Sequence, residues 1–254
     1  MQTAYGRTKI TLCDDYADLG RRSAAAVAND LRALLGRKDT VRAVFAAGES
    51  QGSFLEALSR EPGIDWERVD CFNIDDFWDV RMPVEFTCGR QTCRQLYDRI
   101  RARSVNLVRF DAPDPQAEAA RFEALLRAAP IDLLSQGIGT SGHLALNEPN
   151  DTDFADSRWV RVVEVCEQSK RQLRADPNFQ ALGYIPEKGI TMTIPAIVAV
   201  PRIYTIVPLG LKKPILTRLA TFAQPSEDLP ASILVQTPGE LFVDRDSCPD
   251  AWLG

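Results

Sequence analysis

The sequence predicts an α/β fold with a mostly parallel sheet flanked by helices. Short apolar runs typical of buried strands alternate along the chain with runs whose apolar residues recur at helical spacing. Several strand-like runs end in glycine-containing loops, which is typical of strands that feed a helix. No internal repeat, low-complexity tract or long linker interrupts this alternation. We therefore expect one domain that covers residues 1–254.

The elements are expected in alternating order. The first helix spans Asp18 to Leu35, where Val27, Leu31 and Leu34 recur on one face. Further helical runs cover residues 54–58, 87–101, 117–129, 166–174 and 213–222. Strand-like runs cover residues 41–47, 69–74, 105–110, 131–135, 160–165, 189–193, 203–207 and 241–243. The least regular part is residues 150–187, which we expect to form a lid over a site.

The composition excludes several classes of function. A chain of 254 residues, 45% of them hydrophobic, can bury a large core. Its 35 acidic residues outnumber 30 basic ones, and such a chain is poorly suited to neutralising nucleic-acid phosphates. No run approaches the roughly 20 apolar residues of a membrane span, and the N-terminus lacks the layout of a signal peptide. We expect a cytoplasmic protein with no nucleic-acid and no membrane partner.

The six cysteines are scattered along the chain, which fits reduced and mostly structural thiols. Cys88 and Cys93 lie five residues apart, but no second pair and no nearby histidine completes a zinc motif. We therefore expect no metal site.

Four stretches at strand ends carry candidate chemistry. The first is FAAGESQGSF, residues 45–54, in which a strand runs through glycines into a helix. Backbone amides at a helix start attract anions, so Gly48, Ser50 and Gln51 are candidate phosphate-binding residues.

The second stretch is FNIDDFWDV, residues 72–80. Neighbours in an extended run point to opposite faces, so only one of Asp75 and Asp76 can face a ligand, and helix capping is the alternative.

The third stretch, GIGTSGHLALNEP, holds His143, the only histidine of the chain. Its imidazole is suited to proton transfer near neutral pH, and Glu148 could orient the ring. The alternative is a histidine that only forms hydrogen bonds with the loop backbone.

The fourth stretch is VPLGLKKP, residues 207–214, in which a lysine after Gly210 could bind an anion or face solvent.

Together, the four stretches resemble the glucosamine-6-phosphate deaminase and 6-phosphogluconolactonase family over nearly the whole chain. GIGTSGHLALNEP is similar to the family's GxGxDGHIAFNEP, and FNIDDF is similar to FNMDEY. Residues 190–213 resemble the late strand–turn–strand before the family's phosphate-binding lysine. Residues 230–247 resemble its C-terminal part, although the family often has His where this chain has Gln236 or Thr237. The resemblance implies an open, Rossmann-like sheet and an active site of the aldose–ketose isomerase type.

Residue by residue, the resemblance also implies roles. Asp75 matches the carboxylate that moves a proton between carbons 1 and 2 of the opened sugar. His143 matches the imidazole that helps to open the ring, and Glu148 matches the carboxylate that orients it. Lys213 and Arg171 match the phosphate-binding lysine and the phosphate-binding arginine of the lid.

Two positions depart from the family pattern. Ser141 stands where the family has Asp in the catalytic loop, so it can accept a hydrogen bond but adds no negative charge beside His143. Glu49 puts a carboxylate into the phosphate loop, where two charges about 4 Å apart at an effective dielectric of about 20 repel by about 4 kcal/mol. We expect Glu49 to turn aside at the helix start, or the substrate to differ.

The function expected first is conversion of a 2-amino-2-deoxy hexose 6-phosphate to a ketose phosphate and ammonia, with no cofactor. The partner is then a small-molecule sugar phosphate, and the sequence allows a homo-oligomer as well as a monomer. The first alternative is a lactone hydrolase like 6-phosphogluconolactonase, but this chain continues after His143 into Asn147-Glu148-Pro149, which favours the deaminase. The second alternative is a sugar-phosphate sensor without turnover.

Overall fold

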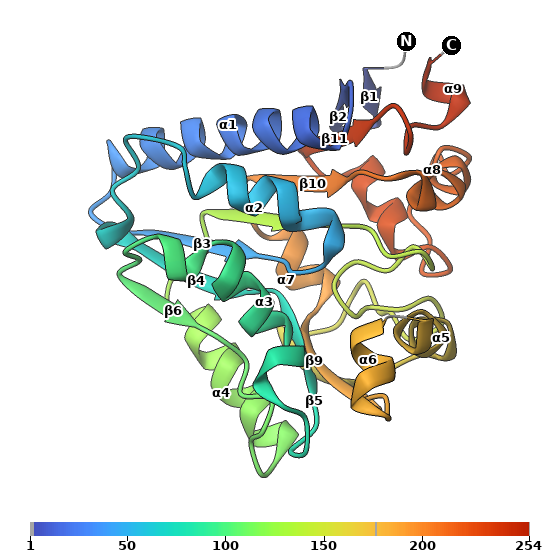
Figure 1. The fold of residues 1–254 in the computed structure, drawn as a ribbon. Helices are drawn as coiled ribbons and strands as arrows, with labels where there is room; N and C mark the ends of the chain where they lie inside the picture. Colours follow the sequence, from blue (N-terminus) through green and yellow to red (C-terminus); the bar gives the residue numbers. More distant parts are fainter. Residues whose placement is uncertain (1–2, 176, 254) are drawn as a thin grey trace.

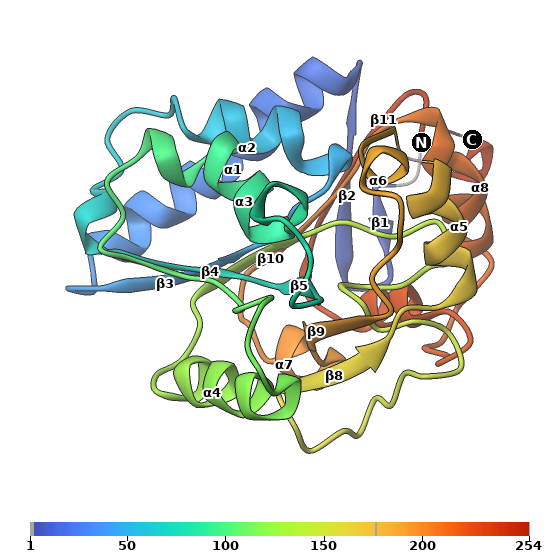
Figure 2. The ribbon, with the colours of Figure 1, turned by 60° about the horizontal axis from the view of Figure 1, so that its bottom comes forward.

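The computed structural model describes residues 3–175 and 177–253 as three layers, with the main sheet in the middle (Figures 1 and 2). The strands of this sheet are β1 (Ala4–Tyr5), β2 (Thr8–Cys13), β3 (Val41–Phe45), β4 (Val69–Asn73), β6 (Ser104–Asn106), β7 (Leu133–Gln136), β10 (Ile203–Val207) and β11 (Gly239–Asp244). The helices are α1 (Tyr16–Leu35), α2 (Gly52–Leu58), α3 (Cys88–Gln95), α4 (Pro115–Arg127), α5 (Glu167–Ala175), α6 (Pro177–Leu182), α7 (Ile194–Val198), α8 (Lys213–Leu219) and α9 (Asp250–Leu253).

Strand order in the main sheet is β1-β2-β11-β10-β7-β3-β4-β6, and every pair is parallel except β1 with β2. This confirms the expected α/β class. The order reverses between β3 and β7, because the chain leaves β3 toward β4 and β6 and then returns to β7 on the other side. In open parallel sheets, ligands bind beyond the carboxyl ends of the strands at such a switch point.

The main strands are buried on both faces because helices cover both sides. Phe45 and Ile206 point toward α1, α2 and α3, while their neighbours Val44 and Val207 point toward the opposite layer. This alternation arises because successive side chains of a strand point to opposite faces of the sheet. Figure 2 shows α1, α2 and α3 on one side of the sheet and α4, α7 and a second sheet on the other.

Side chains at helix starts explain where several helices begin. Asp15 accepts a hydrogen bond from the amide of Asp18 at 2.7 Å and caps α1. Thr87 caps α3 through the amide of Arg90. Asp114 caps α4, with Pro115 as the first helical residue. Such caps satisfy amides that have no partner within the helix.

The second sheet was not expected. Its strands β5 (Asp75–Trp78), β9 (Lys188–Met192) and β8 (Val160–Glu164) pair antiparallel. The strand-like runs at residues 160–165 and 189–193 are therefore strands, but they do not join the parallel sheet. Their inward side chains, among them Val160, Ile190 and Met192, pack into the apolar core beneath it.

Other elements differ in extent from the expectation. The helix expected over residues 87–101 ends at Gln95, because Leu96 adopts φ −134° and ψ −62°. The strand expected over residues 105–110 is shorter and lies at residues 104–106. The sequence did not predict β1, β2, β5, α6, α7 or α9, most of which are short. Within residues 3–175 and 177–253, no helix combines the length and the apolar character that a bilayer crossing requires.

We expect Phe122→Ala to destabilise the fold strongly. Phe122 of α4 is fully buried and packs edge-on against Phe72 of β4, with ring centroids 6.4 Å apart. Truncation of a buried phenylalanine leaves a cavity and costs about 3–5 kcal/mol. Chemical denaturation followed by circular dichroism measures the loss. Val84→Ala, at a side chain that is 45% exposed, should change stability by less than about 0.5 kcal/mol. A similar small loss for Phe122→Ala would contradict this packing.

Candidate active site

A cavity of about 960 Å³ lies at the carboxyl ends of the central strands. The loops after β3, β7 and β10 line it, together with Asp75 of β5 and residues of α5 and α6. Residues from all four candidate stretches of the sequence therefore line one cavity. The fourth stretch contributes Lys212. This is the location that the strand order favours for a ligand.

The side chains of Asp75 and Asp76 point in opposite directions, as expected for neighbours in a strand. Asp75 lines the cavity, whereas Asp76 is turned to the start of α3. There its carboxylate accepts hydrogen bonds from the amides of Phe77, Cys88 and Gly89 at 2.8, 2.9 and 2.7 Å. Burial raises the pKa of Asp76, and these three amides oppose the rise because they stabilise the charged form.

Asp75 is a carboxyl group poised to exchange a proton near neutral pH. Burial raises its pKa to about 7, and the negative charge of Asp76 adds to the rise, while His143 opposes it. A carboxylate with such a pKa is a stronger base than an ordinary aspartate and is still ionised in part at pH 7. General bases are most effective in this range.

His143 lines the same cavity and is held by a network around Glu148. The imidazole Nδ1 lies 2.8 Å from Glu148 Oε1 and 2.9 Å from Ser141 Oγ. Ser141 donates its only hydroxyl hydrogen to Glu148 Oε2 at 2.6 Å, so it accepts from His143. The hydrogen on Nδ1 is therefore shared between Glu148 and Ser141, and Nε2 remains for a substrate.

Glu148 is 4% exposed, and burial opposes its charge. Hydrogen bonds from His143, Ser141 and Ser169 outweigh this effect and lower the pKa of Glu148 to about 2. The group is thus a carboxylate at every ordinary pH. It can stabilise a positive charge on His143 without an aspartate at position 141.

Two glycines make room for this arrangement. A Cβ at Gly139 would lie 2.0 Å from Nε2 of His143, so the ring packs directly on the loop backbone. Gly142 has φ +91°, a conformation that side chains disfavour, and its Cβ would lie 2.2 Å from Leu229. Gly139 and Gly142 of the GIGTSGH motif are therefore explained by the position of the imidazole and the bend that precedes it.

The second sheet anchors the loop that carries His143 and Glu148. Thr191 of β9, which lies opposite Asp75 in the pairing, accepts a hydrogen bond from the amide of Leu146 at 3.1 Å. The side chain of Asn147 donates to the carbonyl of Met192 at 2.8 Å. The strand that pairs with Asp75 thus also holds the loop between His143 and Glu148.

The loop after β3 forms another part of the cavity wall. Gly48 has φ +105° and precedes a short 3-10 helix over residues 49–51. Ser50 lines the cavity, whereas Gln51 is fully buried beneath it and donates to the carbonyl of Ile206 at 3.1 Å. Glu49 is exposed and lines the same wall. Gln51 therefore supports the loop from below rather than facing the cavity.

The residue pattern left Lys212 and Lys213 open and the family resemblance named Lys213, but Lys212 is the lysine that lines the cavity. Burial lowers its pKa, and the charge of Glu49 opposes the lowering. Lys213 pairs with Asp250, with Nζ and Oδ1 2.7 Å apart, and does not line the cavity. The two lysines are adjacent, but Lys212 ends a short 3-10 helix and Lys213 begins α8, where its side chain is turned to Asp250.

Arg171 is also outside the cavity wall. It is exposed on α5, whereas Ser169 and Leu173 of the same helix line the cavity. Those two residues are four apart and share one helical face, and Arg171 lies between them on another face. Ser169 carries no sequence signal of its own, because an isolated serine in a polar helix is common.

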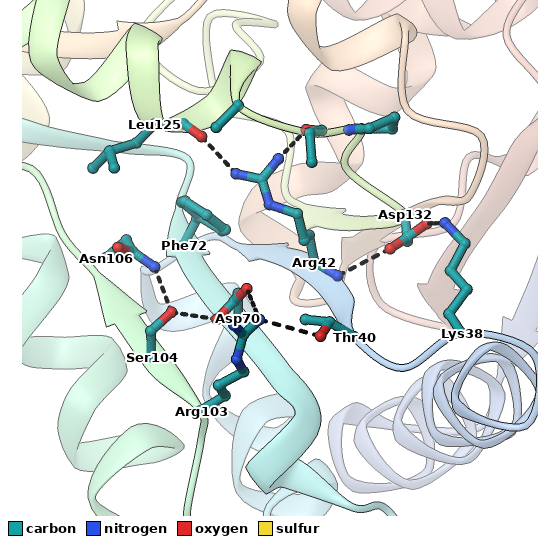
Figure 3. A pocket seen from close by; sticks show the side chains of 13 residues that line it. Lys38, Thr40, Arg42, Asp70, Phe72, Arg103, Ser104, Asn106, Leu125 and Asp132 are labelled. Carbon is teal, nitrogen blue, oxygen red and sulfur yellow. Dashed lines mark hydrogen bonds and ion pairs between the residues drawn. The ribbon is translucent and has the colours of Figure 1, made fainter.

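A cavity of about 390 Å³ lies at the opposite edge of the sheet (Figure 3). Its charged groups neutralise one another: Lys38 pairs with Asp132 and Arg103 with Asp70. Arg42 donates to main-chain carbonyls near the end of α4. These groups are used within the fold, so this cavity is not the candidate site. Within the described residues, no group of three or more His, Cys, Asp or Glu side chains could hold a metal ion.

We expect His143 to carry its neutral-form proton on Nδ1, because Glu148 and Ser141 both accept there. His143 is the only histidine of the chain, so a ¹⁵N NMR spectrum contains one set of imidazole signals. The spectrum is recorded at a pH at which the ring is neutral. Glu148→Gln should weaken the preference, because it removes the charged acceptor. Ser141→Ala should largely retain it, because Glu148 remains. A proton found on Nε2 in the unaltered protein would contradict the network.

Comparisons with known proteins agree with this geometry. The profile of a family described as glucosamine-6-phosphate isomerases/6-phosphogluconolactonase matches residues 14–243. A glucosamine-6-phosphate deaminase of an Exiguobacterium species is 30% identical over 198 residues, which are 77% of this chain and 76% of that protein. The deaminase of Mycoplasmopsis pulmonis is 26% identical over 241 residues, 92% of this chain and 91% of that protein.

Solved structures share the fold. A monomeric glucosamine-6-phosphate deaminase superposes with a TM-score of 0.82 at 23% identity, covering 94% of this chain and 98% of that one. The 6-phosphogluconolactonase of Trypanosoma brucei superposes with a TM-score of 0.75 at 14% identity, covering 96% and 98%. The chain therefore belongs to the glucosamine-6-phosphate isomerase and 6-phosphogluconolactonase family of enzymes.

Proposed function

We propose that this enzyme converts a 2-amino-2-deoxy hexose 6-phosphate to a ketose phosphate and ammonia. The observation that carries the proposal is that Asp75, with a pKa of about 7, and the imidazole of His143 line one cavity. An aldose–ketose conversion needs a base for a carbon acid and a second group that handles protons on oxygen. The deaminase names of the relatives described above support the same reaction.

In the proposed reaction, His143 first moves the proton of the anomeric hydroxyl to the ring oxygen, and the bond between carbon 1 and that oxygen breaks. Asp75 then takes the proton from carbon 2, and the freed electron pair forms the carbon 1–carbon 2 double bond. The oxygen on carbon 1 receives a proton from the substrate ammonium through His143. Asp75 returns its proton to carbon 1, which leaves an iminium at carbon 2. Water adds there, and ammonia leaves as the ketose forms.

Glu148 and Ser141 assist this chemistry through His143. The carboxylate of Glu148 favours the positively charged imidazole that exists whenever His143 holds a second proton. Ser141 supports the same nitrogen as an acceptor without adding charge. With a serine at position 141, Glu148 is the carboxylate that supports the charged imidazole of His143 in this chain.

The phosphate is proposed to lie at the loop after β3, next to Lys212. The positive φ of Gly48 sets the turn before the short 3-10 helix, and Ser50 lines the cavity there. Lys212 lines the same cavity, interacts electrostatically with Glu49 of this loop and supplies a positive charge there. Glu49 is exposed, so its carboxylate can turn to solvent when the phosphate binds. Lys212 therefore replaces Lys213 in the proposed site, and Arg171 has no role in it.

The deaminase is preferred to a lactone hydrolase because Glu148 is bonded to the imidazole and Asp75 provides a base for a carbon acid. The lactonases among the solved structures share the fold at low sequence identity. We also propose a cytoplasmic location, which is supported by six cysteines that are all free thiols.

We expect Asp75→Asn to reduce turnover by about 10²–10⁴-fold, the usual contribution of a general base, with little change in stability. Because Asp75 must be ionised to act, kcat/KM should rise with pH through about 7. Asp76→Asn should move this rise to lower pH, since it removes the negative charge that helps to raise the pKa of Asp75. Coupled assays of ammonia and ketose phosphate measure both effects. Near-normal turnover in Asp75→Asn would refute the assignment of the base.

We expect Lys212→Ala to raise KM for a sugar phosphate by about tenfold or more, because hydrogen bonds to charged groups contribute about 1.5–3 kcal/mol. The unphosphorylated sugar should be affected much less. Lys213→Ala is the matched control: it removes the neighbouring lysine, whose partner is Asp250, and should leave KM nearly unchanged. If Lys213→Ala has the larger effect, the phosphate does not lie beside Lys212.

A further inference from the structure

Ser169 provides a contact between α5 and the catalytic network. Its hydroxyl donates to Glu148 Oε1, the same oxygen that lies 2.8 Å from His143 Nδ1. Ser169 also lines the active-site cavity. The two residues are 21 positions apart, and they lie on separate elements. Glu148 is therefore held by donors from its own loop and by one donor from outside it.

The first turn of α5 is fixed close to the end of β8. The amide of Lys170 donates to the carbonyl of Cys166 at 2.9 Å, and the amide of Ser169 lies 3.3 Å from Cys166 Sγ. Just before this turn, the amide of Val165 donates to the carbonyl of Glu187 at 2.8 Å. Position 169 is thus tied to the second sheet, which also carries Asp75.

The far end of the same helical segment is docked by aromatic contacts. Phe179 of α6 is 8% exposed, and its ring packs edge-on against Phe77 and Phe86, with centroids 6.0 and 5.7 Å apart. Phe77 follows the two aspartates in β5. The segment of α5 and α6 therefore contacts the site twice, through Ser169 at the histidine side and through Phe179 beside the strand of Asp75.

We propose that Ser169 is a positioning residue, whose hydroxyl orients the Glu148 carboxylate and thereby the His143 ring when α5 is docked over the cavity. The inference rests on the proposed function for its effect on turnover. Ser141 holds Oε2 of Glu148 and Ser169 holds Oε1, so each carboxylate oxygen has a hydroxyl donor. Loss of the second donor frees the carboxylate to rotate about its side-chain bonds, and the imidazole follows it. Hydrogen bonds to an ionised acceptor are the strong ones, which makes this contact effective.

The proposal is tested with three variants of the full chain. Ser169→Ala removes the hydroxyl, and Ser169→Thr retains it. Gln168→Ala is the matched control, because Gln168 is an exposed neighbour on the same helical turn. For each variant, kcat and KM for ammonia release from an amino-sugar phosphate are measured. The Nδ1–H signal of His143 is measured separately by NMR without substrate.

We expect Ser169→Ala to lower kcat by about tenfold, the effect of losing one hydrogen bond to a charged group, with KM nearly unchanged. The Nδ1–H signal should shift or exchange faster. Ser169→Thr should restore both, and Gln168→Ala should alter neither.

Two results would overturn the proposal. One is an unchanged His143 signal and an unchanged kcat in Ser169→Ala, and the other is an effect on KM alone, which would make Ser169 a substrate contact. If no amino-sugar phosphate releases ammonia, the proposed function fails, and the NMR signal still decides the role of Ser169.

Discussion

The buried carboxylate of Glu148 is the group on which the arrangement of the site depends. It is placed where burial opposes its charge, and it remains ionised because His143, Ser141 and Ser169 donate to it. Removing a buried carboxylate of this kind leaves its donors without a partner, which is costly. The same bonds orient the imidazole of His143, so the stability of this loop and the position of the ring have one cause.

The second sheet explains how Asp75 meets this network. Asp75 follows β4 of the main sheet, but it begins a strand that pairs with β9. Thr191 and Met192 of β9 bind the loop that carries His143 and Glu148. Asp75 and His143 come from distant parts of the sequence and are thereby held by one strand, through main-chain pairing with β5 and through hydrogen bonds that involve the side chains of Thr191 and Asn147.

Acidic side chains outnumber basic ones in the lining of the cavity, which is unusual for the anion site that we propose there. Asp75, Glu49 and Glu56 line it, whereas Lys212 is the lysine among its lining residues. The charge of Asp76 helps to keep Asp75 protonated for part of the time near pH 7, which lessens this imbalance. The loop after β3 and the N-terminal ends of short helices add positive potential without charged side chains. In the proposed site, these backbone groups would therefore bind the phosphate together with Lys212.

The sequence by itself determined the α/β class, most of the long helices and strands, and the loops that meet at the site. Those features follow from hydrophobic periodicity and glycine placement, which are local properties of the chain. Only the tertiary structure decided that β5, β8 and β9 form their own antiparallel sheet, since strand partners are distant in sequence. It also decided that Lys212 rather than Lys213 lines the cavity. The residue pattern left Asp75 and Asp76 open, and the family resemblance named Asp75, which does line the cavity. Adjacent residues of the same type have nearly the same local signal, and the direction in which each side chain points is set by the elements packed around it. Ser169 had no signal at all, because its partner Glu148 becomes a neighbour only when the chain is folded.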